Sequence, residues 1–185
     1  NNSVIMNKGA GLYFHPIADP VMEKIGKKGK TTEFIYHDAL VEESILYFIL
    51  YKFAKDLPAD IKSYIDSFTQ TRTKTLTEVV KENVVEIVVD EETGEEKEVK
   101  KVVSKNVTTE VSYEYTTLVE DFGKDEKFLE LLNDMLSKKD TYSLMVGEDL
   151  ITHPNSENLA KLCGIIDRYT EFNVVIIPSQ TNTLG

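Results

Sequence analysis

The chain alternates between short apolar runs and longer segments in which apolar residues recur every three or four positions. The short runs predict strands at residues 11–16, 33–36, 142–147 and 173–178. The longer segments predict helices at about 19–25, 38–54, 60–68, 125–136 and 155–169. Strands that alternate with helices indicate an α/β fold with a mainly parallel sheet flanked by helices in Rossmann-like layers.

Most of the expected helices begin at a residue that can cap a helix. Asp19 is followed by Pro20, a favoured first helical residue, and Asp38, Asp125 and Asn155 are expected N-caps. The helix after Asp38 is apolar on nearly every side, which predicts a helix buried between two layers.

Residues 78–119 follow a different pattern, with apolar and polar residues alternating every second position. The alternation predicts strands at 84–89, 99–103 and 107–115, with a turn at 90–94. We therefore expect an antiparallel β hairpin or meander (78–119) inserted into an α/β domain made of residues 1–77 and 120–185. Its many glutamates and lysines indicate a solvated protrusion, and a docking arm for a neighbouring subunit is the alternative.

Composition narrows the possible functions. The 185 residues include 32 acidic and 21 basic side chains, and the formal charge of -11 disfavours nucleic acid as a partner. The single cysteine, Cys163, cannot form an intrachain disulfide, hold an iron–sulfur cluster or build a multi-thiolate zinc site, and we expect an inert helix thiol.

The longest apolar run, 44–51, is too short to span a bilayer, and no signal peptide precedes it. Both ends of the chain suggest a piece of a longer polypeptide.

Candidate chemistry is expected at the carboxyl ends of the strands, where ligands bind in sheets of this kind. Gly147 stands alone there without a phosphate-binding motif, and the following Glu148 and Asp149 would repel an anion. Each histidine adjoins a proline or a capping residue, so we expect turn and capping roles rather than a metal site, and we assign no catalytic, cofactor-binding or metal-binding residue. The potential ligands considered are His15, Asp19, His37, Asp38, Asp149 and His153.

Several motifs together resemble a known family. The motifs lie at residues 144–150, 153–154, 158–160, 174–178 and 181–185. The first part of the chain adds a matching order of elements: an acidic residue and a proline, then a helix, a strand and the long helix after His37 and Asp38. These motifs resemble one subunit of bacterial NADH-quinone oxidoreductase. That subunit holds iron–sulfur clusters and contains a region similar to molybdopterin oxidoreductases, and the resemblance is to this region. The resemblance covers about residues 10–68 and 125–185 of that region, and the insertion at 78–119 departs from it.

The resemblance implies a structural, non-catalytic segment of a peripheral-arm electron-transfer subunit of the respiratory complex. It implies contacts with other peripheral-arm subunits and a cytoplasmic location beside the inner membrane. The family's iron–sulfur ligands are cysteines in another part of the subunit, so no cofactor is expected in this segment. Two alternatives remain: a pterin- or nucleotide-binding enzyme domain of the molybdopterin oxidoreductase type, and a protein-binding module that uses the β meander.

Overall fold

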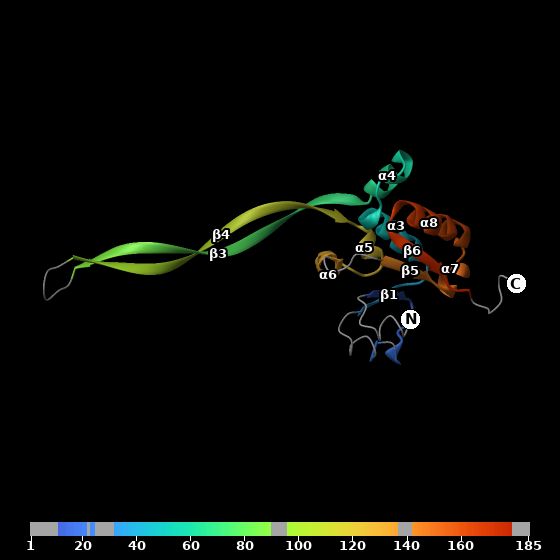
Figure 1. Ribbon diagram of the computed structural model, residues 1–185, viewed down its shortest axis with the longest axis horizontal. Coiled ribbons are helices and arrows are strands. Elements are labelled where there is room, and N and C mark those ends of the chain that lie inside the picture. The colour runs from blue at the N-terminus through green and yellow to red at the C-terminus, as the bar shows by residue number, and fades with distance from the viewer. Residues whose placement is uncertain (1–10, 22, 25–31, 90–95, 137–141, 179–185) are drawn as a thin grey trace. The chain divides into compact units, whose positions relative to one another are not determined.

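The fold is described by a computed structural model for residues 11–21, 23–24, 32–89, 96–136 and 142–178 (Figure 1). The chain divides into two compact units. One, here called the α/β unit, comprises Asn1–Gln70 and Thr116–Gly185, and the other, the ribbon, comprises Thr71–Tyr115. The predicted turn at 90–94 and the motif at 181–185 lie outside the described residues.

The α/β unit contains two pairs of short parallel strands and the described helices. In the first pair, β1 (Gly11–His15) lies beside β2 (Thr32–Tyr36), with Gly11 opposite Thr32. In the second pair, β5 (Tyr142–Val146) lies beside β6 (Phe172–Ile176), with Tyr142 opposite Phe172. The helices are α3 (Glu42–Phe53), α4 (Ala59–Asp66), α5 (Leu118–Asp121), α6 (Glu126–Leu136), α7 (Glu148–Ile151) and α8 (Ser156–Tyr169).

The prediction of a mainly parallel sheet with Rossmann-like layers is wrong. The described strands form separate two-stranded sheets: β1–β2 parallel, β5–β6 parallel, and β3–β4 antiparallel. Apolar runs mark where strands form, but pairing depends on contacts between residues far apart in the sequence. The β5–β6 pair also leaves Met145 and Val175 more than 40% exposed, whereas strands in a layered parallel sheet are covered on both faces.

The predicted three-stranded meander is corrected to two long strands. β3 (Thr69–Val89) and β4 (Glu96–Thr116) each contain 21 residues and pair with each other in a twisted ribbon (Figure 1). The polar residues 104–106, expected between two strands, instead lie within β4. Their side chains are solvent-exposed, so they interrupt no buried face of the strand.

The core of the α/β unit is built around α3. Ile45, Leu46, Phe48, Ile49 and Leu50 are all buried on this helix. The ring of Phe122, 1% exposed, lies 5.5 Å from Phe48 and packs edge-on against it. The same ring also contacts residues of β1 and α6, so one buried aromatic side chain joins three elements.

Of the four predicted N-caps, two are confirmed by hydrogen bonds, and one is wrong. The fourth, Asn155, occupies the N-cap position of α8 but its side chain makes no capping hydrogen bond. Asp125 accepts the backbone N–H of Lys127 at 3.0 Å, and Asp19 accepts that of Val21 at 3.0 Å. Asp38 does not cap α3. The helix begins at Glu42, and Leu40, two residues before it, has a left-handed φ of 72°. The left-handed residue separates Asp38 from the helix, a turn that the sequence did not indicate.

Candidate functional site

The structure places the predicted strand-end residues in separate local contacts. His15, at the end of β1, has its Nε2 3.5 Å from Oδ2 of Asp149 on α7. The other ring nitrogen of His15, Nδ1, lies 2.8 Å from the carbonyl oxygen of Ile17 and 3.0 Å from its backbone nitrogen, and the tautomer of the ring decides which of the two groups it bonds. This second contact is the turn role expected from the sequence. The adjacent Tyr13 has a raised pKa because of burial and the nearby charges of Asp19 and Asp149.

The remaining histidines lie elsewhere in the unit. His37 is buried, with Nδ1 2.8 Å from the carbonyl oxygen of Asp38. His153 is also buried, and its Nδ1 accepts the backbone N–H of Asn155 at 2.9 Å, just before α8. No group of three or more His, Cys, Asp or Glu side chains among the described residues is arranged to hold a metal ion.

The sequence did not reveal the contact between His153 and Glu42. The Nε2 atom of His153 lies 3.5 Å from Oε2 of Glu42, in the first turn of α3, and the two side chains are only 4% and 9% exposed. Because Nδ1 of His153 accepts a hydrogen bond, the neutral ring carries its proton on Nε2, the atom that faces Glu42. The 3.5 Å separation is too long for a good hydrogen bond, so the contact is mainly electrostatic.

A second polar contact joins α3 to α8 itself. Nδ2 of Asn158, on α8, donates to Oε1 of Glu43 at 2.5 Å. Tyr47, one turn further along α3, has a raised pKa, mainly because of burial. The hydrogen bond between Asn158 and Glu43 therefore ties the first turn of α8 to the first turn of α3. Glu42 and His153 lie far apart in the sequence, which explains why no local motif could have revealed the arrangement.

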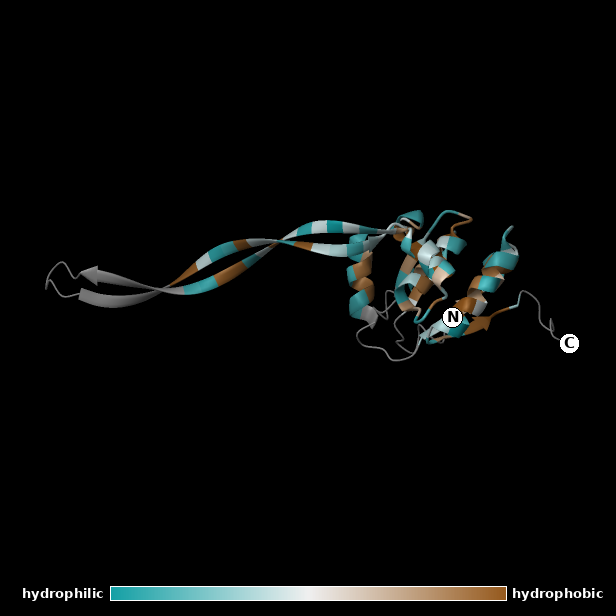
Figure 2. Ribbon diagram, turned by 90° about the horizontal axis from the view of Figure 1, so that it is seen from above, coloured by the Kyte–Doolittle hydropathy of each residue, from teal (hydrophilic) through white to brown (hydrophobic). Residues whose placement is uncertain are grey.

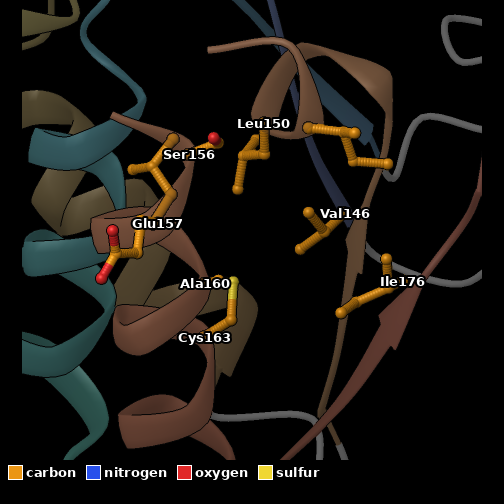
Figure 3. A pocket seen from close by; sticks show the side chains of 9 residues that line it. Val146, Leu150, Ser156, Glu157, Ala160, Cys163 and Ile176 are labelled. Atoms are coloured by element: carbon orange, nitrogen blue, oxygen red, sulfur yellow. The ribbon is translucent and has the colours of Figure 1, made fainter. Parts of the chain in front are cut away.

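A cleft of about 360 Å³ lies between α8 and the ends of β5 and β6. Figure 3 shows Val146 and Ile176 on the strand side, facing Cys163 on α8. The carboxylate of Glu157 points away from the cleft in the same view, and it accepts a hydrogen bond from Lys161 at 2.7 Å. That bond lowers the pKa of Glu157.

The chemistry of the cleft is that of an apolar surface. Apart from Ser156 and Glu157, its lining consists of apolar side chains and Cys163. Cys163 is 5% exposed, and burial raises the pKa of its thiol, which disfavours the reactive thiolate. The prediction of a buried helix thiol is therefore confirmed.

Apolar side chains are also uncovered on the β5–β6 pair. Met145 is 43% exposed, and the directly paired Val175 is 46% exposed. Ile177, whose N–H donates to the carbonyl oxygen of Val146 at 2.8 Å, is 44% exposed. These three exposed apolar side chains are here called the β5–β6 apolar face.

Comparisons with known proteins do not identify a family for this chain. No protein-family model matches it, and neither a curated protein nor a solved structure matches it significantly. None of the described helices is both long and apolar enough to cross a membrane.

Proposed function

We propose that this chain is a structural, non-catalytic segment of a peripheral-arm electron-transfer subunit of NADH-quinone oxidoreductase, similar to the molybdopterin-oxidoreductase-like region of that complex. In this proposal the segment acts by contact with other peripheral-arm subunits, in the cytoplasm beside the inner membrane. Electron transfer belongs to iron–sulfur clusters held by cysteines elsewhere in the parent subunit.

The observation that carries the proposal is the arrangement of the motifs that resemble this family. The described motifs belong to one continuous stretch of structure: β5, α7, α8 and β6, in which two parallel strands are joined by helices. Residues 147–150 form the turn into α7, and residues 158–160 lie in the first half of α8. Motifs that build one strand–helix–strand unit support a common structural origin better than scattered matches would.

The β5–β6 apolar face supports the proposed mode of action. A patch that includes Met145, Val175 and Ile177 loses contact with water when another protein covers it, and this burial favours association. A pterin or nucleotide would instead need polar groups aimed into a pocket and donors for its phosphates. The described cleft is apolar, and α7 begins with Glu148 and Asp149, whose carboxylates repel phosphate.

The proposal is tested by purifying the chain, with an affinity tag, from cells that express it within its native polypeptide. We expect the tagged protein to elute as a large assembly that oxidises NADH and shows iron–sulfur signals in electron paramagnetic resonance. Elution without NADH-oxidising activity would contradict the assignment. A rise in the melting temperature of the isolated chain with guanine nucleotides would favour the enzyme-domain alternative.

The ribbon favours the second candidate function, a protein-binding module. An isolated pair of strands is at best marginally stable in water unless it packs against something else. The outer edge of a two-stranded ribbon can also pair with an extended segment of another chain. The exposed apolar side chains of the ribbon give this candidate its specific support.

A further inference from the structure

The turn between α7 and α8 is held by the side chain of His153. Residues 152–155 connect the two helices, and the backbone N–H of Ser156 donates to the carbonyl oxygen of His153 at 3.0 Å. Within this turn, Nδ1 of His153 accepts the backbone N–H of Asn155 at 2.9 Å. Pro154 occupies the second position of the turn, where the fixed φ of proline is favoured. The imidazole therefore supplies the acceptor that an Asp or Asn side chain supplies in an Asx-turn.

The opposite side of the same ring faces α3. Its Nε2 atom lies 3.5 Å from Oε2 of Glu42, and both atoms are buried without a hydrogen-bond partner among the described residues. Glu42 is the charged side chain that the described structure places against the ring. The carboxylates near it on the packed helices are exposed or engaged elsewhere: Glu43 of α3 with Asn158, Asp149 of α7 with His15, Glu157 of α8 with Lys161, and Glu148 of α7 in solvent.

The turn borders the apolar cleft on both sides. Leu150 and Ile151 of α7 precede the turn, Ser156 and Glu157 of α8 follow it, and all four line the cleft (Figure 3). The opposite wall includes the end of β6, which Figure 2 shows as hydrophobic next to the C-terminus. A change in the turn therefore changes the separation of the two helices that enclose this apolar surface.

We propose that His153 is a pH-sensitive switch that opens the apolar cleft when its ring takes up a second proton. In the imidazolium form both ring nitrogens carry a proton, so neither can accept a hydrogen bond. Nδ1–H then faces the N–H of Asn155, donor against donor, and the hydrogen bond that holds the turn is lost. Nε2–H still faces the carboxylate of Glu42, which attracts the charged ring more strongly than the neutral ring. The ring therefore stays on α3 while the start of α8 is released.

The direction of the pH effect follows from which form of the turn binds the proton better. In the closed turn, protonation of His153 costs the hydrogen bond to Asn155, whereas in the open turn that bond is already absent. Glu42 faces the ring in both forms, so its charge favours protonation without selecting one form. The open turn therefore takes up the proton more readily, and a fall in pH opens the cleft. The switch is independent of the assignment to NADH-quinone oxidoreductase.

The test is the rate at which Cys163 reacts with dithiodipyridine, a thiol reagent that also works in acid. Cys163 lines the cleft, is 5% exposed and is the single cysteine, so its reaction reports access to this place alone. At each pH the rate in the folded full chain is divided by the rate in urea, which removes the intrinsic pH dependence of the thiol. We expect this ratio to rise about tenfold from about pH 8 to about pH 5, the range in which imidazoles titrate, because one hydrogen bond is lost.

Three variants separate the switch from a general effect of acid. In His153→Asn, the new amide oxygen accepts the N–H of Asn155 at every pH, so the ratio should stay low and flat. Glu42→Gln removes the charge that favours the imidazolium, so the rise should move to lower pH. The matched control is His15→Asn, the same change at the other histidine that precedes a proline, and it should retain the rise of the wild type.

Hydrogen exchange at the amide of Asn155 gives a second readout that needs no variant. Its protection, relative to the intrinsic exchange rate at each pH, should fall over the same range in the wild type. Circular dichroism verifies that every variant is folded at both ends of the range. The proposal is overturned if the wild-type ratio is flat, if Asn155 stays protected in acid, if His153→Asn shows the same rise as the wild type, or if His15→Asn abolishes it.

Discussion

The buried contact between Glu42 and His153 offers the sharpest test of how α3 and α8 are held together. Replacement of either side chain by leucine removes one polar group and leaves the other enclosed without its partner. Replacement of both removes the pair and leaves an apolar contact of similar volume. Because the two side chains are only 9% and 4% exposed, water cannot easily compensate the remaining group.

The size of the effect follows from burial and distance. Enclosing a neutral or charged polar group without a hydrogen-bond partner costs about 1–3 kcal/mol, and the 3.5 Å separation between Nε2 and Oε2 makes this a weak contact from the start. We expect each single substitution to lower the free energy of unfolding by about 2 kcal/mol. The double substitution should cost about 1 kcal/mol less than the sum, because it leaves neither group without its partner.

Urea denaturation of the wild type, both single variants and the double variant gives the coupling free energy directly. His153→Leu also removes the acceptor for the N–H of Asn155, but this loss occurs in both arms of the cycle and cancels. Additivity of the two substitutions within about 0.5 kcal/mol would refute the reasoning, because it would show that the two side chains do not interact.

Three further predictions concern the rest of the α/β unit. Cys163 should react with a thiol reagent such as DTNB about a hundredfold more slowly in the folded protein than in urea, because burial excludes the reagent and raises the pKa of the thiol. Phe122→Ala should lower the free energy of unfolding by about 4 kcal/mol in chemical denaturation, because it empties the centre of the aromatic cluster. Lys55, whose Nζ lies 2.6 Å from Oε1 of Glu171, lowers the pKa of that carboxyl group, so the pair stabilises the fold above the ordinary pKa of Glu171. This stability is lost as pH falls through the lowered pKa, and Lys55→Met should flatten the acid side of a plot of melting temperature against pH.

Local features of the fold could be predicted from the sequence. The apolar runs that predicted β1 and β5 form those strands, and Asp125 caps α6 through its carboxylate, because these features depend on neighbouring residues. The buried state of Cys163 also followed from its position on the apolar side of a helix. In each case the deciding pattern is local in the sequence.

Features that depend on distant contacts could not be predicted. The strands do not form one sheet, because no local pattern specifies which strands exchange hydrogen bonds. The polar stretch 104–106 suggested the end of a strand, but polar residues are tolerated on a ribbon exposed to solvent. The contact between Glu42 and His153 likewise required the folded arrangement of α3 and α8.

The central claim is that the chain acts by binding other proteins, and the β5–β6 apolar face tests it most directly. Val175→Glu places a charge on this face, whereas Leu131→Glu changes a side chain of similar exposure on α6; the two residues are 46% and 41% exposed. The measurement is the NADH-oxidising activity that copurifies with each tagged variant, per mole of chain. The account predicts that Val175→Glu loses most of this activity and Leu131→Glu retains it. Equal recovery with both variants would contradict the claim.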